Sequence, residues 1–216
     1  MICFQESSGI QYGVFELADR DEMASLLAEA FSGYDPPALA MGVSAEEFET
    51  VVRPFGPGAA AEGLTIVARS AVTGEMVGAL LTADFTAPPP AGTEPVNEKF
   101  LPVFTLIDQL DAQYQRDKTL EPGTHLHLLL LGVARPFTGR QVAQHLIAAC
   151  EENGRRKGYR AAVTEASGSV SQHVFRKQGY ADRFQISYQD YRYEGAPVFA
   201  SIEGHSGMIL MDKVLA

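Results

Sequence analysis

The sequence predicts an α/β (α+β) domain in which a twisted mixed sheet is flanked by helices. The first observation is that residues 125–133, His-Leu-His-Leu-Leu-Leu-Leu-Gly-Val, are nearly all apolar, as in a central strand buried on both faces. The second is that strand-like and helix-like segments follow one another along the whole chain without an internal repeat. At 216 residues the chain suits one domain spanning residues 1–216.

The first half of the chain alternates apolar stripes with turn residues. Apolar spacing and capping residues predict a strand at 13–17, a helix from about Asp19 to Phe31, a short helix opened by Ser44 and ended by Pro54, and a hairpin of strands at 64–69 and 76–82. Four prolines between residues 86 and 96 mark this stretch as a surface excursion rather than a linker, because the next segment has a helical pattern again.

The second half continues the same alternation around the central strand. Its pattern predicts an amphipathic helix at 97–118, the strand at 125–133, a helix at about 139–157, a strand at 159–164, a short helix at 169–177, and closing strands at 184–193 and 208–214.

The turn after the central strand is the first candidate binding site. Arg135 and Pro136 end the strand, and Thr138-Gly139-Arg140-Gln141 lead into a helix. A helix start offers free backbone N–H groups and partial positive charge, so this geometry suits a phosphate or pyrophosphate. Arg140 adds a full charge there, unless its side chain is merely solvated.

Residues 125–147 resemble the coenzyme A-binding core of the GCN5-related N-acetyltransferase (GNAT) superfamily. In that family a strand leads into a turn reading Arg/Gln-x-x-Gly-x-Gly/Ala. When Val133 takes the place of the family valine, Gly139 and Ala143 fit, whereas Thr138 and Gln141 depart from the pattern. The order of elements is also that of the family. The resemblance implies a GNAT fold, with a mostly antiparallel sheet of about seven strands.

A second stretch, residues 169–180, is similar to the family's final motif. Ser171 takes the small-residue place, Phe175 falls where many members have a general-acid tyrosine, and Lys177 faces either the 3′-phosphate of the coenzyme or water. The resemblance implies acetyl-CoA as cosubstrate, with these residues as its contacts: Leu131, Gly132, Val133, Thr138, Gly139, Arg140, Gln141, Val142, Ala143, Ser171, Phe175 and Lys177.

Phe31-Ser-Gly-Tyr-Asp-Pro-Pro37 resembles the Phe-x-x-x-Glu-Pro-Leu segment of the arylalkylamine (dopamine-type) N-acetyltransferase branch. There the carboxylate before the proline is the catalytic base, which implies the same role for Asp35 with a shorter reach. The alternative is that Asp35 only starts a turn, as Asp before Pro often does. Tyr34, Phe85 and Tyr188 are candidate walls of an aromatic acceptor pocket, or simply core residues.

Three further side chains are candidate proton acceptors for an attacking ammonium group. His125 and His127 share one face of the central strand, and an imidazole titrates near neutral pH. Both are equally well interpreted as hydrogen-bonded core histidines. Two histidines two residues apart also suit a metal, but no third ligand shows a matching spacing, so we expect no metal site. Glu165 either binds a cationic amine or caps the following helix.

Composition narrows the partners and the compartment. The net charge of −10 disfavours nucleic acid and favours a cationic small molecule. Two cysteines, no apolar run of membrane length and no basic signal-peptide start predict a protein of the reducing cytoplasm without membrane contact. A homodimer is left open.

The sequence therefore predicts an enzyme, an N-acetyltransferase that moves an acetyl group from acetyl-CoA to a primary amine by direct attack in a ternary complex. A small cationic or arylalkyl amine is the favoured acceptor. Two alternatives stay open: a non-catalytic acyl-CoA-binding module with the same fold, and an acetyltransferase for protein N-termini or lysine side chains.

Overall fold

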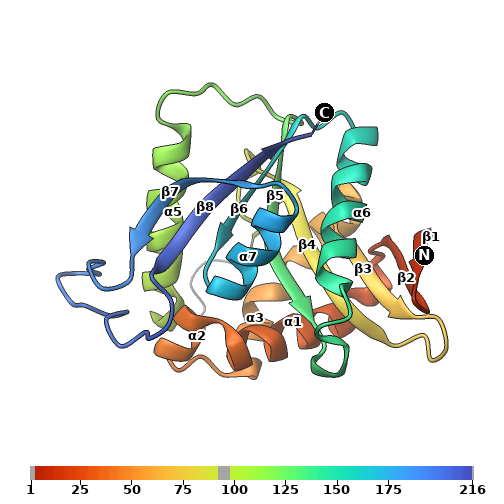
Figure 1. Cartoon of the computed structure of the whole chain (residues 1–216), viewed down its shortest axis with the longest axis horizontal. Coiled ribbons are helices and arrows are strands. Elements are labelled where there is room, and N and C mark those ends of the chain that lie inside the picture. Colours follow the sequence, from red (N-terminus) through yellow and green to blue (C-terminus); the bar gives the residue numbers. More distant parts are fainter. Residues whose placement is uncertain (1–2, 92–97, 216) are drawn as a thin grey trace.

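The computed structural model describes residues 3–91 and 98–215, which build a sheet with helices on both faces (Figure 1). The sheet has eight strands in the order β1-β2-β3-β4-β5-β6-β8-β7. Among these strands β5 and β6 pair in parallel and the other neighbours pair antiparallel. The bounds are β1 Cys3–Ser7, β2 Ile10–Val14, β3 Ile66–Ser70, β4 Met76–Asp84, β5 His125–Val133, β6 Ala161–Ala166, β7 Ala181–Ser187 and β8 Gly207–Val214.

Two layers of helices cover the sheet. The described α-helices are α1 Arg20–Tyr34, α2 Pro36–Ala40, α3 Ala45–Val52, α4 Phe55–Glu62, α5 Leu101–Gln115, α6 Val142–Arg156 and α7 Ser169–Lys177. Helices α6 and α7 pack on one face, whereas α1 with α3 and α4, and separately α5, pack on the other (Figure 1). Each face therefore has its own apolar core.

Strand alternation separates these cores. On β4, Leu80 points to the core under α6, whereas Ala79 and Leu81 point to the core under α1, and all three are buried. Burying a leucine side chain contributes about 1.5–3 kcal/mol, so both layers of helices are held mainly by such contacts.

Close packing of α1 against β5 depends on Gly132. A Cβ atom at this position would lie 2.8 Å from Leu27 Cδ2 and 3.3 Å from Ala30 Cβ. A side chain there would push α1 away from the sheet. The residue is therefore needed for the position of α1, whose C-terminus leads directly to Asp35.

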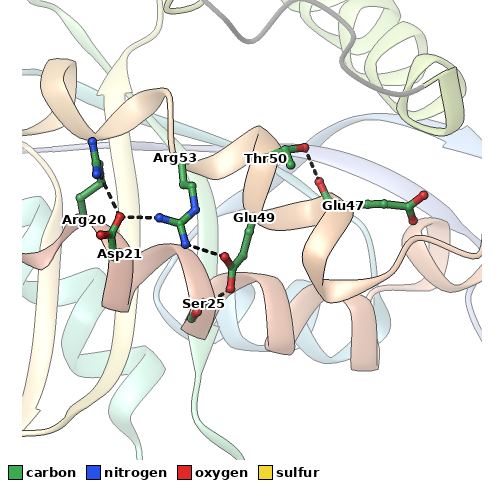
Figure 2. Close-up of polar contacts among 7 residues, drawn as sticks. All are labelled: Arg20, Asp21, Ser25, Glu47, Glu49, Thr50 and Arg53. Carbon is green, nitrogen blue, oxygen red and sulfur yellow. Dashed lines mark hydrogen bonds and ion pairs between the residues drawn. The ribbon is translucent and has the colours of Figure 1, made fainter.

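Polar contacts also fix α1 to α3 (Figure 2). Arg53, directly after α3, reaches Asp21 of α1 at 2.5 Å and Glu49 at 2.7 Å. Ser25 Oγ donates to Glu49 at 2.5 Å. Exposed ion pairs of this kind stabilise by about 0–1 kcal/mol each, so they orient the helices more than they hold them.

Most predicted elements are confirmed. The helices at 97–118, 139–157 and 169–177 correspond to α5, α6 and α7, and the capping box at Ser44 opens α3. The predicted mixed and mostly antiparallel sheet is confirmed as well, with eight strands in place of about seven.

Three differences have local causes. The additional strand β1 pairs with β2 through a two-residue turn at Ser8 and Gly9, whose φ angles of 51° and 73° suit a tight hairpin. The first strand predicted at 13–17 lies at Ile10–Val14 instead. Pro54 is expected to end the helix opened by Ser44, and α3 does end before it, at Val52. The additional helices α2 and α4 begin at Pro36 and directly after Pro54, because proline is well tolerated in the first turn of a helix.

Two expectations concern the chain outside regular structure. Residues 86–91 of the Pro-rich excursion contain no helix or strand, whereas residues 92–97 lie outside the described residues. Within the described part of the chain, no helix is both long enough and apolar enough to cross a membrane.

Candidate active site

The parallel pair at the centre of the sheet opens part of the way along. The β5–β6 ladder covers His125, Leu126 and His127 and then ends, although β5 continues for six further residues to Val133. Thr164 Oγ1 of β6 donates to the Leu128 carbonyl oxygen at 2.9 Å and closes the vertex of this opening. Beyond the vertex, β5 presents an edge that β6 does not pair.

The backbone of β5 is directed into this opening. Ala134 donates its N–H to Val77 of β4 at 2.9 Å, so the preceding residue turns its backbone groups the other way. By the same alternation, the backbone N–H and C=O groups of Leu131 and Val133 point into the opening at the unpaired edge, while Gly132 pairs with Ala79 on β4. An extended ligand with amide groups would find strand-like hydrogen-bond partners at Leu131 and Val133.

The turn beyond β5 leads directly to the start of α6. Gly139 has φ 76° and Gln141 has φ 63°, so both lie in the left-handed region. Glycine reaches this region freely, whereas another residue is strained by about 1–2 kcal/mol. Gln141 thus adopts the conformation for which the GNAT turn uses glycine.

The N–H groups of the first turn of α6, those of Val142 and Ala143 among them, have no acceptor within the helix. The Arg140 guanidinium stacks over the Phe137 ring at 5.1 Å, and Thr138 Oγ1 donates to the Arg135 carbonyl oxygen at 2.9 Å. The turn therefore combines unpaired donors, the helix dipole and one cation, as an anion site requires.

The predicted contacts on α7 have different surroundings. Ser171 caps its own helix, because its hydroxyl accepts from the Gly168 N–H and donates to the Gly168 carbonyl oxygen. Phe175 is 2% exposed and packs edge-on against Tyr180, with ring centroids 5.0 Å apart. Lys177 is exposed at the end of α7.

Asp35 lies between α1 and α2 and is held by two donors. Its carboxylate accepts from the Ala38 N–H at 2.9 Å, as the cap of α2, and from Ser167 Oγ at 2.5 Å. Burial raises the pKa of the Asp35 carboxyl, and the hydrogen bonds from Ser167 and Ala38 oppose this. Asp35 is therefore both a turn residue and a carboxylate whose charged form is hydrogen-bonded.

Ser167 and His205 complete what we call the Asp35 site. Ser167 follows β6 directly, and His205 precedes β8. His205 Nδ1 accepts from the Ser169 N–H at 3.0 Å, and an electrostatic interaction with His205 also lowers the pKa of Asp35. Gly168 lies against both Pro36 and His205, which brings α2, α7 and the β7–β8 loop together.

Two cavities flank the Asp35 site. One of about 440 Å³ lies between α1 and the end of β5, and its walls include Gly33, Tyr34, Val133 and Arg135. The other, of about 350 Å³, lies between α2 and the β7–β8 loop, lined by Tyr34, Pro36, Leu39, Ala40, Ser201, Ile202, Glu203 and His205. Tyr34, the residue before Asp35, lines both cavities, and Pro36, the residue after it, lines the second.

A second group of titratable side chains lies near the vertex, and we call Asp111, His127 and Glu165 the acidic cluster. His127 Nε2 lies 2.7 Å from Glu165 Oε2, and the His127 ring contacts Phe85 with centroids 4.8 Å apart. Burial, and then Glu165 and Asp108, raise the pKa of Asp111 to about 9. A pKa raised this far favours the protonated form of Asp111 at neutral pH.

His125 does not join this cluster. Its Nδ1 lies 2.8 Å from Thr124 Oγ1, and its ring lies edge-on to Tyr114. Burial, and then the nearby Lys118, lower the pKa of His125. The two histidines that share a strand face thus have separate environments.

The acidic cluster also has the donor types of a metal site. One ligand atom from each of its three residues lies within 4.8 Å of the others. However, His127 Nε2 and Glu165 Oε2 are separated by 2.7 Å, which is a hydrogen-bond distance, whereas two ligands on tetrahedral zinc lie about 3.3 Å apart. Zinc would thus have to separate this pair.

Three residues of the two sites were not predicted from the sequence. Asp111 carried a usable signal, since it lies four residues after Ile107 and three before Tyr114, on the apolar stripe of its helix. Ser167 and His205 carried none, because each gains its role only through a contact with a distant segment.

Comparisons with known proteins agree with this geometry. The sequence profile of the acetyltransferase (GNAT) family matches residues 60–180. The chain resembles the C-terminal condensation domain of Ebony in complex with β-alanyl-dopamine, with a TM-score of 0.86 and 16% identity over 95% of this chain and 98% of that one. No curated protein matches the chain.

Two further structures share the fold. Arylalkylamine N-acetyltransferase 2 from Aedes aegypti gives a TM-score of 0.80 and 20% identity over 97% of this chain and 100% of that one. Drosophila melanogaster polyamine N-acetyltransferase, which catalyses the formation of N-acetylagmatine, gives a TM-score of 0.73 and 17% identity over 95% of this chain and 99% of that one. The family profile covers more than half of the chain and includes both the β5–β6 opening and the turn before α6, so this chain belongs to the acetyltransferase (GNAT) family.

Proposed function

We propose that this enzyme transfers an acetyl group from acetyl-CoA to the primary amine of a small arylalkyl or cationic acceptor. The observation that carries the proposal is the continuous path from the unpaired edge at Leu131 and Val133 to the anion-binding turn at Gly139. Coenzyme A carries amide groups in its pantetheine arm, followed by a pyrophosphate. The amide groups match the unpaired edge of β5, and the pyrophosphate matches the turn at Gly139.

On the acceptor side, the cavity at the β7–β8 loop supports an amphipathic amine. Its walls combine apolar and aromatic side chains, such as Tyr34, Leu39 and Ile202, with the carboxylate of Glu203. Such a combination suits a ligand with an aromatic or alkyl body and an ammonium group. It supports the predicted arylalkylamine-like acceptor over a nucleic acid.

The reaction needs a proton acceptor, because amines are mostly protonated at neutral pH. Asp35 in its ionised form accepts that proton, directly or through water. The amine nitrogen then attacks the thioester carbonyl carbon, the C–S bond breaks, and the thiolate leaves. Phe175 has no hydroxyl to donate, so in this proposal the thiolate takes its proton from water. Backbone groups at the β5 edge orient the thioester.

The first test is calorimetric titration with acetyl-CoA and, separately, with ATP. We expect acetyl-CoA binding that Gly139→Asp or Arg140→Glu weakens by about tenfold or more, since each places an anion at the pyrophosphate. Arg116→Glu, at an exposed arginine after α5, is the matched control and should leave the affinity unchanged.

Turnover with a panel of amines then separates the alternatives. Acetyl-CoA binding without transfer to any amine would favour the non-catalytic acyl-CoA-binding module. Transfer to peptide N-termini or lysine in preference to phenylethylamine would favour the protein acetyltransferase. Absence of acetyl-CoA binding would contradict the proposed function.

A further inference from the structure

Within the acidic cluster Glu165 is paired with His127, whereas no positively charged group among the described residues acts on Asp111. Of the charged groups that influence Asp111, Glu165 and Asp108 are both acidic and both oppose its ionisation. The Glu165 side chain is 5% exposed. Glu165 Oε1 and Asp111 Oδ1 are buried, and neither receives a hydrogen bond from a donor in the described part of the chain.

Buried carboxylates in this state need a proton or a cation. An ionised carboxyl without a partner costs several kcal/mol, so the empty cluster keeps a proton. An incoming cation can replace that proton, because it satisfies the same two oxygens. The aromatic rings beside the cluster favour an organic cation, since Phe85 contacts both the His127 ring and the Tyr114 ring.

The cluster is also placed next to the open edge of β5. Thr164 closes the vertex, and Glu165 is the next residue along β6. Its side chain is buried, although the residue as a whole is half-buried, and it lies past the point where β5 and β6 stop pairing. A chain held along the unpaired edge that extends toward the vertex would therefore approach Glu165.

We propose that the acidic cluster is a subsite for an alkylammonium group of a substrate, with Glu165 and Asp111 as the anionic partners and His127 positioning Glu165. The inference deepens the proposed function, on which it rests. Two sources offer this chemistry: an amino group at the end of the transferred acyl chain, or a second amino group on the acceptor.

Calorimetric titration of the full chain with matched pairs distinguishes these sources. One pair is 3-aminopropanoyl-CoA and butanoyl-CoA, which have equal acyl length and differ in the terminal charge. The other is 1,4-diaminobutane and pentylamine. In one of the two pairs, we expect the member with the additional ammonium group to bind at least about tenfold more tightly than its partner, as a charged hydrogen bond would give. The pair that shows the preference identifies the source.

Proton release gives a readout that needs neither turnover nor a variant. If the ammonium group displaces the proton of the cluster, binding at pH 7 releases about one proton more for the member with the additional ammonium group than for its partner. The dependence of the binding enthalpy on the ionisation enthalpy of the buffer measures this number. Equal proton release for both members would overturn the proposal.

Two variants locate the effect. Glu165→Gln and Asp111→Asn should each remove the preference for the charged member and leave the affinity for butanoyl-CoA unchanged. Asp117→Asn, an exposed carboxylate just after α5, is the control and should keep the preference. If zinc chloride alone binds and abolishes the preference at equimolar amounts, the cluster is a metal site and the proposal fails.

The subsite and the proposed function fail separately. If neither matched pair shows a preference and both thioesters bind in a manner that depends on Gly139, the subsite is wrong and the proposed function stands. If neither thioester binds, the proposed function itself is wrong.

Discussion

The Asp35 site and the acidic cluster each hold buried carboxyl groups, yet they are equipped differently. Asp35 receives hydrogen bonds from Ser167 and from the Ala38 N–H, and His205 favours its charged form. Asp111 instead faces Glu165, and both Glu165 and the further acidic group Asp108 oppose the ionisation of Asp111. Burial raises the pKa of both aspartates, but only at Asp35 do surrounding donors oppose it.

This contrast separates two kinds of chemistry that a carboxyl group performs. A carboxylate supported by donors remains available as a base and returns its proton easily. A carboxyl pair in which Asp111 has no donor holds a proton until a cation replaces it. We therefore assign proton transfer to Asp35 and cation binding to the acidic cluster.

The largest expected effect comes from removing the base. Asp35→Asn should lower kcat/KM for amine acetylation by about 10²–10⁴-fold near neutral pH, where the free amine is scarce. The loss should shrink at high pH, because the amine then loses its proton without help. The pH dependence of kcat/KM measures this, and an unchanged profile would remove Asp35 from the mechanism.

Asp111 in the acidic cluster should affect the free energy of unfolding rather than the rate of acetylation. The pKa of Asp111 is raised to about 9, so between about pH 4 and 9 the folded state holds a proton that the unfolded state has released. Stability therefore falls as pH rises through this window. Asp111→Asn mimics the protonated form and should raise the free energy of unfolding by about 1–3 kcal/mol at pH 9.

The difference should vanish toward pH 4, which urea denaturation at several pH values tests. A variant less stable than the parent chain at pH 9 would contradict the raised pKa. The expected gain would also mean that the chain keeps a cluster that weakens it, as functional sites often do.

A smaller effect tests whether donors make Asp35 a base. Ser167→Ala removes a hydrogen bond that favours the ionised carboxylate, so the acid limb of kcat/KM should move to higher pH. The rate on that limb should fall about three- to tenfold, with the plateau retained. Ser187→Ala at the end of β7 serves as control. An equal loss at every pH would indicate a structural role for Ser167.

The smallest expected effect concerns Gln141, which belongs neither to the Asp35 site nor to the acidic cluster. Gln141→Gly relieves a left-handed backbone and should raise the free energy of unfolding by about 0.5–1 kcal/mol. Gln144→Gly, three residues further inside α6, should lower it by up to about 1 kcal/mol. Chemical denaturation compares the two, and a loss at Gln141 would mean that its side chain is needed in the turn.

Local patterns in the chain were enough to predict most elements and one binding feature. Apolar periodicity depends on neighbouring residues only, so it sufficed for β5, α5, α6 and α7, and for the helix start after Gly139. The acetyltransferase family was also readable in the sequence, since it depends on a contiguous turn. The single domain, the individual site residues, the cytoplasmic location and a homodimer stay predictions.

Which side chains act together depends on the folded chain. Asp35 and Ser167 meet although 132 positions separate them, and Asp111 reaches His127 and Glu165 from another helix. His125 and His127 share a strand face, yet their neighbours differ. A local pattern specifies the direction of a side chain, whereas its charge state depends on burial and on partners from distant segments. The sequence therefore predicted Asp35 as a candidate base but not its hydrogen bond with Ser167, and no pattern in it connects Asp111 with Glu165.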